Sequence, residues 1–256
     1  LLRELKIKET YFAGGAQGIA ALALGTKTIK AVNKIFGPGN AFVAEAKKQL
    51  FGTVGIDLIA GPSEIIVVAD KKNNPKWVAA DLMAQAEHDI NAQSILITDN
   101  LTFAKEVLKN IEYLNKNMLK KKTISRSLNC NGLILLVNNF KNCADIINFI
   151  APEHLHLHIK SYKRILPKIS NAGGIFLGEY SAEAFGDYIV GTNHILPTSG
   201  AAKFSSGLGV LDFMKRSSIV QMNSKSFQDL SNDTKNMASI EGLEAHKMSV
   251  TIRQKK

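Results

Sequence analysis

Short apolar runs rich in branched residues alternate with longer helical patterns through the middle of this 256-residue chain. Residues 65–69, 94–98 and 132–137 have the length and composition of buried strands. Residues 75–89 and 103–118 lie between them and show helical spacing. Strands that alternate with helices of this length form βαβ units, so the pattern predicts an α/β fold with a parallel sheet covered by helices on both faces.

The composition agrees with a globular core and argues against several other classes of protein. Hydrophobic residues make up 45% of the chain and charged residues 21%. No apolar run approaches the roughly 20 residues that cross a bilayer, and no basic segment followed by an apolar one occurs near Leu1, so we expect a cytoplasmic protein. Cys130 and Cys143 lie far apart without a Cys-x-x-Cys spacing, which argues against a disulfide framework and a thiolate zinc site.

The formal net charge of +10 suggests nucleic-acid binding as one interpretation. Apart from residues 120–122, however, the lysines are spread along the chain and interleaved with asparagines, without an aromatic stacking motif beside them. A compositional bias toward Lys and Asn explains the charge better. An RNA-binding module, which would bind with steep salt dependence, is kept as an alternative.

Residues 75–89 carry the polar group on which the functional hypothesis is built. Pro75 suits the first turn of a helix, and the Ala- and Leu-rich run after it favours helix formation. Gln85 and His88 are three residues apart and therefore share a face of that helix, with Asp81 one turn earlier on the same side. Such a trio can hold a metal, but glutamine is not among the usual zinc ligands, so a polar face wetted by solvent is the simpler interpretation.

Two glycine-rich stretches near the N-terminus are candidates for ligand binding. Residues 13–23 combine small residues with Gln17, which suits a helix that packs closely against other backbone or opens onto a ligand. The loop over residues 37–40 precedes a helix predicted over residues 41–50, and Asn40 is the expected N-cap. The first stretch does not match the spaced glycine fingerprint of dinucleotide-binding folds.

The second half of the chain contributes a run of histidines and a polar loop. His154, His156 and His158 alternate with apolar residues, which predicts a strand with three imidazoles on one face. These imidazoles form either a second metal site or, more simply, polar groups that face water. Glu153 and His154 are adjacent at the start of the strand, so we expect them to point to different sides and do different jobs. Residues 179–197 concentrate polar and turn residues, as functional loops do.

Other segments complete the predicted fold. Ser63 and Asp70 flank the strand at residues 65–69, at turns where parallel sheets place ligands. Helices are also expected over residues 163–171, 208–214 and 226–247, and a strand over residues 175–177.

Six short motifs, laid side by side, closely resemble those of histidinol dehydrogenase. They are Gly37-Pro38-Gly39-Asn40, Ala60-Gly61-Pro62-Ser63-Glu64, Gln85-Ala86-Glu87-His88, Ala151-Pro152-Glu153-His154, Gly191-Thr192-Asn193-His194 and Glu241-Gly242-Leu243-Glu244-Ala245-His246. Six separated motifs in one order are far more specific than any single one. The resemblance implies a homodimeric, zinc- and NAD-dependent enzyme of histidine biosynthesis that oxidises L-histidinol to L-histidine through histidinaldehyde.

The resemblance also implies a role for each matching residue. Glu153 would activate the water that attacks the aldehyde, and His154 would be the general base that removes the alcohol proton. The zinc ligands would be Gln85, His88 and Asp187 of one subunit and His246 of the partner subunit. The substrate would contact these ligands together with His154, Ser63, His194 and Glu241, and NAD would contact Gln17 and Asn40.

The family carries a further N-terminal region, so the resemblance implies incomplete Rossmann-like parallel-sheet domains with a C-terminal helical tail. We expect residues 1–62 to be the remainder of an α/β domain with the NAD contacts and residues 63–207 a Rossmann-like domain with the metal and catalytic residues. Residues 208–256 would be a helical tail packed on the dimer partner. No nucleic-acid or membrane partner is expected. Two alternatives stay open: a truncated homologue that binds zinc without turnover, and a related amino-alcohol dehydrogenase with changed substrate contacts.

Overall fold

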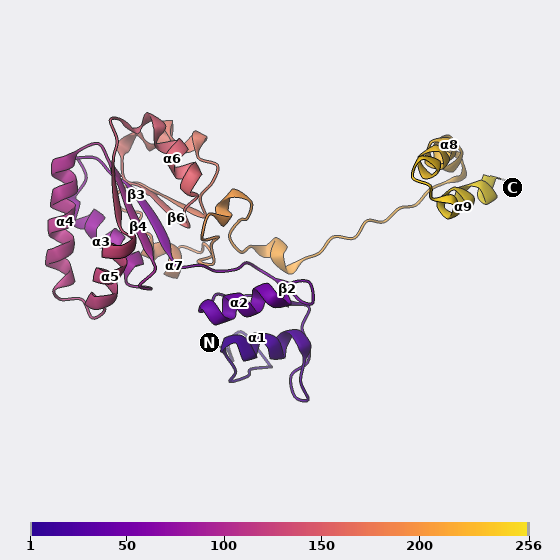
Figure 1. Cartoon of the computed structure of the whole chain (residues 1–256), viewed down its shortest axis with the longest axis horizontal. Coiled ribbons are helices and arrows are strands. Elements are labelled where there is room, and N and C mark those ends of the chain that lie inside the picture. The colour runs from indigo at the N-terminus through magenta and orange to yellow at the C-terminus, as the bar shows by residue number, and fades with distance from the viewer. Residues whose placement is uncertain (1, 255–256) are drawn as a thin grey trace. The chain divides into compact units, whose positions relative to one another are not determined.

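The computed structural model describes residues 2–254, which form two compact units. The larger unit extends to Asp212, and the smaller unit begins at Phe213. Figure 1 shows a sheet flanked by helices in the larger unit and a pair of helices, α8 and α9, in the smaller one. None of the described helices is both long enough and apolar enough to span a bilayer.

A five-stranded parallel sheet forms the centre of the larger unit and confirms the predicted α/β fold. The chain runs outward from β3 to β5 and then returns to place β6 on the other side of β3, as in doubly wound folds. The strands are β3 (Glu64–Val68), β4 (Gln93–Thr98), β5 (Leu133–Leu136), β6 (His154–Leu157) and β7 (Gly174–Leu177), in the spatial order β5-β4-β3-β6-β7.

Helices lie on both faces of this sheet (Figure 1). The helices among the described residues of the larger unit are α1 (Gly15–Leu24) and α2 (Ala41–Leu50), which lie apart from this sheet, and α3 (Pro75–Ala86), α4 (Leu101–Asn115), α5 (Lys121–Asn131), α6 (Cys143–Ile150) and α7 (Ala184–Tyr188). Short 3₁₀ turns occur at Phe140–Asn142, Lys160–Arg164, Leu166–Lys168, Ala201–Lys203 and Val210–Phe213.

The strands alternate their side chains between two apolar cores, which is why both faces are covered. Ile65 of β3 belongs to the core formed with α3 and α4, and Ile66 belongs to the opposite core formed with α6. Leu155 and Leu157 of β6 join the α6 core, so the histidines that alternate with these leucines point to the opposite face of the sheet, toward α3. These histidines are buried, and the expectation that they face water is therefore wrong.

Helix α3 begins as predicted but ends earlier. Pro75 occupies its first turn, and the Asn74 side chain accepts a hydrogen bond from Lys76 N–H. The last helical residue is Ala86, and His88 lies in the following turn rather than on the helix predicted to reach Asp89. The reason is that the Asp89 carboxylate accepts a hydrogen bond from Asn91 N–H, which forms a turn that leads the chain into β4.

Three other segments differ from the predicted helices. Helix α5 was not predicted, because its sequence is polar and it buries few apolar side chains. Residues 163–171, predicted as one helix, instead fall in two 3₁₀ turns separated at Ile165. Pro167 accounts for the break, because its ring lacks an N–H and cannot continue an α-helical ladder. Residues 208–214 form only the 3₁₀ turn at Val210–Phe213.

The first part of the larger unit contains α1, α2 and a short parallel pair, β1 (Lys34–Ile35) with β2 (Gly55–Ile56). Asn40 caps α2, as predicted, by accepting hydrogen bonds from Phe42 and Val43 N–H. Lys47 of α2 is buried, and its Nζ donates to the Asp57 carboxylate and, at 2.7 Å, to the Gly37 carbonyl. These contacts fix the glycine-rich loop at residues 37–40 beside the start of α2.

The smaller unit consists of α8 (Ser224–Ile240) and α9 (Glu244–Gln254), which pack against each other. Two helices confirm the helical character predicted for residues 226–247. Gly242, with a φ of 70°, adopts the left-handed conformation that a tight turn between helices requires. Ser231 and Ala238 of α8 are buried, whereas many larger apolar side chains of the unit are exposed.

Candidate functional site

A cavity of about 400 Å³ lies beside the amino ends of β3 and β6. Five segments far apart in the sequence line it: the loop before α2, the loop before β3, the end of α3, the residues before β6 and the loop around α7. The cavity brings together eight residues to which the sequence assigned a role: Asn40, Ser63, Gln85, His88, Glu153, His154, Asp187 and His194.

The cavity lies at the amino edge of the sheet, opposite to the carboxyl edge where doubly wound folds commonly bind ligands. Ser63, immediately before β3, lines the cavity. Asp70 follows the same strand seven residues later, which places it roughly 20 Å away along the strand direction. Asp70 therefore does not border this cavity, and its carboxylate accepts a hydrogen bond from Lys72 N–H.

His154 is buried, and its ring orientation is fixed from one side. Its Nδ1 lies 3.1 Å from the carbonyl oxygen of Glu64, and because a carbonyl only accepts, Nδ1 carries the proton. Its Nε2 lies 3.6 Å from Oε1 of Glu183. Burial lowers the pKa of His154, but contacts with Glu153 and Glu183 outweigh it and leave the pKa raised.

Glu153 is held by a reciprocal pair of hydrogen bonds with Glu64. Glu64 N–H donates to Oε2 of Glu153 at 3.0 Å, and Glu153 N–H donates to Oε2 of Glu64 at 3.3 Å. Oε2 of Glu153 lies 3.5 Å from Nδ1 of His154, so the two side chains share one cavity and do not point to different sides. The strand alternation does not apply to them because β6 begins only at His154.

Glu183 completes this buried group and was not assigned a role from the sequence. Burial is the main cause that raises its pKa to about 7, and Asp187 adds to the effect, while His154 opposes it. Ligand-type atoms of His154, Glu183 and Asp187 lie within 4.8 Å of one another. The polar loop over residues 179–197 was the sequence signal for this region, but nothing in it distinguished Glu183 from its neighbours.

Gln85 has the features of a buried ligand. Its side chain is 1% exposed, and within residues 2–254 its Nε2 has no hydrogen-bond partner. Nε2 is a donor, so the amide oxygen is the atom of Gln85 that could bind a metal, and the Gln85 side chain also acts to lower the pKa of Glu183. His88 and Asp187 line the same cavity, so an amide, an imidazole and a carboxylate lie around one cavity, with Asp187 in place of the Asp81 that the helix spacing suggested.

Of the remaining predicted site residues, Gln17 belongs to the larger unit and does not line this cavity. Gln17 is exposed on α1. Glu241, at the end of α8, and His246, near the start of α9, are exposed in the smaller unit. Their assigned roles therefore stay predictions.

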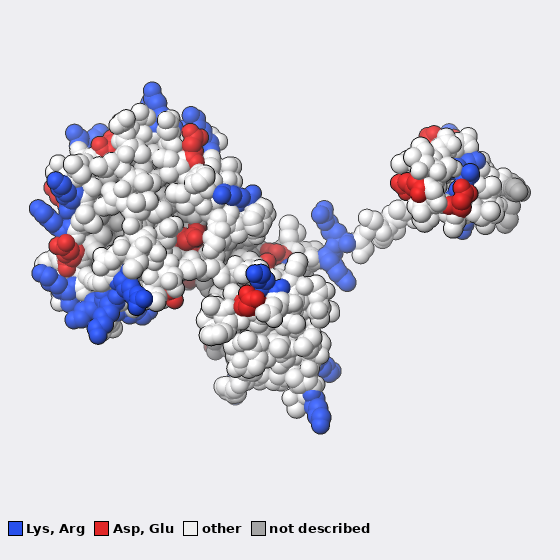
Figure 2. All heavy atoms as spheres, in the orientation of Figure 1, with Lys and Arg blue, Asp and Glu red and all other residues white. Residues whose placement is uncertain are grey.

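Figure 2 shows Lys and Arg side chains scattered over the visible face, with one denser group on the larger unit. A shallow trough of about 730 Å³ between α4 and α5 is lined by basic residues that include Lys116, Lys121, Lys122 and Arg126. It shares no lining residue with the candidate site.

Comparison with known proteins identifies the family that this chain matches. Residues 1–254 match the family model described as histidinol dehydrogenase. The histidinol dehydrogenases of Brucella abortus (strain 2308) and Rhizobium meliloti (strain 1021) are each 51% identical to the chain over 247 residues, which is 96% of this chain and 57% of each relative. The chain therefore spans little more than half the length of these relatives.

A solved structure agrees with this result. The crystal structure of histidinol dehydrogenase from Elizabethkingia anophelis matches with a TM-score of 0.92 and 39% sequence identity. The match covers 99% of this chain and 58% of that chain.

Proposed function

We propose, because this chain belongs to the histidinol dehydrogenase family, that it provides the metal- and substrate-binding part of an enzyme that oxidises L-histidinol to L-histidine. The observation that carries the proposal is the convergence of eight residues from five separate segments on one cavity. A homodimeric state, a cytoplasmic location and the use of zinc and NAD belong to the same proposal.

Zinc is the metal that fits the residues present. We propose Gln85, His88 and Asp187 as its ligands, with His246 of the partner subunit as the fourth. The three side chains line one cavity, which supports this ligand set, and the amide oxygen of Gln85 would be its ligand atom. Two imidazoles, one carboxylate and one neutral amide would leave the ion with a net positive charge, able to orient the substrate and polarise its alcohol oxygen.

His154 would remove the proton from the substrate alcohol. Its Nδ1 proton is held by the Glu64 carbonyl, so Nε2 is the atom left to act as the base. The imidazolium formed in this step would be stabilised by the Glu153 and Glu183 carboxylates on either side of the ring. An imidazole suits the task because its pKa lies near neutral pH.

Glu153 would activate the water that attacks the aldehyde. Its hydrogen bond from Glu64 N–H keeps the carboxylate at the cavity, where a water between it and the aldehyde could lose a proton. Ser63 and His194 line the same cavity and would contact the substrate. Direct attack by water needs no cysteine, and neither Cys130 nor Cys143 lines this cavity.

NAD would supply the hydride acceptor for both oxidation steps. Asn40 lines the cavity, whereas Gln17 does not, so only one of the two proposed NAD contacts borders the proposed substrate site. The side-chain oxygen of Asn40 is engaged in capping α2, which leaves its amide group as the donor available to a cofactor.

The test is a calorimetric titration with histidinol of the zinc-loaded 256-residue chain, together with metal analysis. We expect one zinc per chain at this site and a measurable affinity for histidinol. His246→Ala should lose histidinol binding, while Arg253→Ala, at an exposed polar residue of the same helix, should retain it. Histidinol binding that is unchanged in both His246→Ala and His88→Ala would refute the proposed ligand set.

Turnover distinguishes the alternatives. NADH formation at saturating histidinol supports the full dehydrogenase reaction, whereas zinc and histidinol binding without NADH formation identifies a non-catalytic homologue. Preference for another amino alcohol over histidinol would identify a related dehydrogenase. Glu241 is the substrate contact whose substitution should change that preference most.

A further inference from the structure

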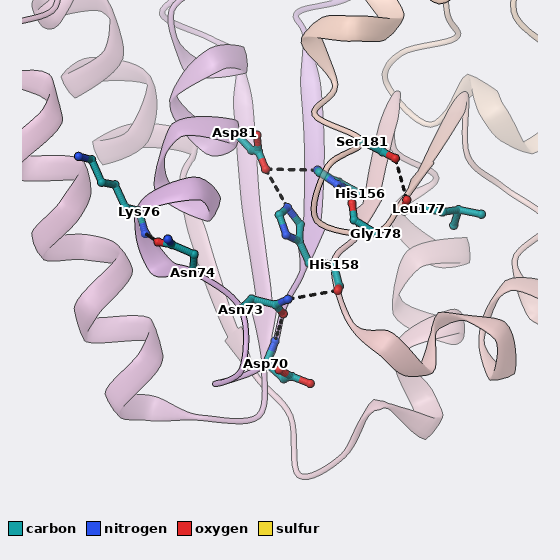
Figure 3. A network of polar contacts seen from close by, with 10 residues as sticks. All are labelled: Asp70, Asn73, Asn74, Lys76, Asp81, His156, His158, Leu177, Gly178 and Ser181. Atoms are coloured by element: carbon teal, nitrogen blue, oxygen red, sulfur yellow. Dashed lines mark hydrogen bonds and ion pairs between the residues drawn. The ribbon is translucent and has the colours of Figure 1, made fainter.

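A second buried cluster of metal-ligand type lies on β6 and α3, outside the proposed catalytic cavity. It consists of Asp81 of α3 with His156 and His158, and Figure 3 shows the Asp81 carboxylate directed at both rings. Oδ2 of Asp81 lies 2.8 Å from Nε2 of His158 and 3.3 Å from Nδ1 of His156. Neither histidine lines the proposed catalytic cavity, and the proposed reaction does not use them.

The protonation of His156 is set by its other nitrogen. Its Nε2 lies 2.8 Å from the carbonyl oxygen of Gly178, so Nε2 carries the proton. In a neutral ring Nδ1 then presents a lone pair toward the Asp81 carboxylate. Nδ1 has no hydrogen-bond partner among the described residues, although the side chain is fully buried. Two electron-rich atoms that face each other in a buried place repel unless a cation lies between them.

The distances suit a metal ion of the zinc class. The 3.3 Å between Asp81 Oδ2 and His156 Nδ1 matches the separation of two ligand atoms on a tetrahedral ion with bonds of about 2.0 Å. The 2.8 Å between Asp81 Oδ2 and His158 Nε2 is a hydrogen-bond distance, so this pair would have to separate by about 0.5 Å when an ion binds. The three candidate ligand atoms come from Asp81, His156 and His158 and lie within 4.8 Å of one another. The Gly178 carbonyl would act on His156 as backbone carbonyls commonly act on metal-bound histidines, by fixing the tautomer and the orientation of the ring.

The cluster also borders a cavity through which an ion and a further ligand could reach it. Asp81 lies on the wall of a second cavity of about 290 Å³, which Trp77, Glu179 and Tyr180 also line. This cavity leaves the outer side of the Asp81 carboxylate reachable, with its side chain 12% exposed. A water or the Glu179 carboxylate could therefore complete the coordination of an ion.

From this geometry we propose a second metal site, in which Asp81 Oδ2, His156 Nδ1 and His158 Nε2 bind a divalent ion of the zinc class between α3 and β6. The nitrogen ligands favour zinc or cobalt over magnesium or calcium, which prefer oxygen. Because α3 also carries Gln85 and β6 also carries His154, an ion at this place would join the two elements that supply the proposed metal ligand and base. The alternative to a metal ion is a single proton on His156, which would lie between the ring and the Asp81 carboxylate.

The experiment counts zinc on the full 256-residue chain after chelator treatment, reloading and removal of excess metal. His156→Ala should lose one equivalent relative to the wild type. His88→Ala, the matched control, removes a ligand of the proposed catalytic site and should leave the equivalent at the second site in place. If the catalytic site holds no zinc in this chain, the wild type binds one equivalent, and that equivalent is still lost in His156→Ala.

A second measurement covers the case in which His156→Ala fails to fold. Asp81→Asn preserves the volume of the side chain and removes its charge. In the His88→Ala background we expect the visible absorption of tetrahedral Co²⁺, and adding Asp81→Asn should abolish or shift it while the circular dichroism stays unchanged. An unchanged cobalt spectrum, or a zinc count that His156→Ala does not alter, would overturn the proposal in favour of a proton.

Discussion

Glu183 is the residue whose protonation matters most for the candidate site. It is 2% exposed and lies between Nε2 of His154 and the carboxylate of Asp187. With a pKa raised to about 7, this side chain exchanges its proton within the range where the proposed base must work. The protonation state of Glu183 therefore decides whether His154 faces a neutral carboxylic acid or a charged carboxylate.

The raised pKa predicts a pH-dependent stability that Glu183→Gln removes. The folded protein holds this proton more tightly than the unfolded chain between pH 4.5 and about 7, so the stabilisation is present at low pH and is lost as the pH rises through this window. Up to about 3 kcal/mol of the free energy of unfolding should be lost in the wild type relative to Glu183→Gln. Urea unfolding of both proteins at intervals between about pH 5 and about pH 8 measures the difference.

The control for this measurement is Glu106→Gln, an exposed carboxylate of α4. It should follow the wild-type profile throughout. Parallel stability profiles for the wild type and Glu183→Gln would contradict the raised pKa of Glu183.

The residues that the sequence identified are those embedded in specific motifs. Gln85, His88, Glu153 and His194 were found in this way, and all four line one cavity. Asp81 was placed on the same helix face as Gln85, but in the structure it contacts the histidines of β6. Such contacts depend on how β6 packs under α3, and the spacing within one segment carries no information about a second segment.

At the scale of elements, runs of apolar residues predicted the central strands β3 and β4 well because both are buried on both faces of a parallel sheet. Helix α5 escaped prediction for the opposite reason, since it is a polar surface helix with few buried side chains. The position of the cavity at the amino edge of the sheet could not be predicted either. It depends on the loops before β3 and α2 meeting the end of α3, which are contacts between distant segments.

The cap of α2 is the element-scale feature with a clear test, because Asn40 has two possible roles. Its side-chain oxygen accepts from Phe42 and Val43 N–H, each at 3.1 Å. Asn40→Ala should lower the free energy of unfolding by about 1 kcal/mol. Asn40→Asp keeps the acceptor and suits the positive end of the helix, so it should stay within about 0.5 kcal/mol of the wild type.

Urea unfolding measures these stabilities, and NAD titration of the same two variants separates capping from cofactor binding. Asn40→Asp, which lacks the amide donor, should weaken NAD binding if that donor contacts the cofactor. Equal stability losses in the two variants would mean that the hydrogen bonds to Phe42 and Val43 do not stabilise α2.

At the scale of the whole molecule, the two units differ in how much apolar surface they bury. The larger unit buries an apolar core on each face of its five-stranded sheet. The smaller unit is a pair of helices whose large apolar side chains are exposed to solvent. Ile240 is 86% exposed and Met237 is 64% exposed. A pair of helices this short cannot bury a sufficient core alone, so its exposed apolar face is a natural contact for a second copy of the chain.

We expect the chain to sediment as a dimer through the exposed apolar residues of α8 and α9. The double substitution Ile240→Glu with Met248→Glu puts charges on surfaces that a dimer would bury, and it should shift the chain to monomers in analytical ultracentrifugation. Leu119→Glu makes the same change at a fully exposed residue between α4 and α5 and should leave the dimer intact. Because His246 lies between these two positions, the monomeric variant should also lose histidinol affinity. A variant that stays dimeric would show that these residues do not form the dimer contact. A monomer that binds histidinol as tightly as the wild type would show that a single chain completes its own site.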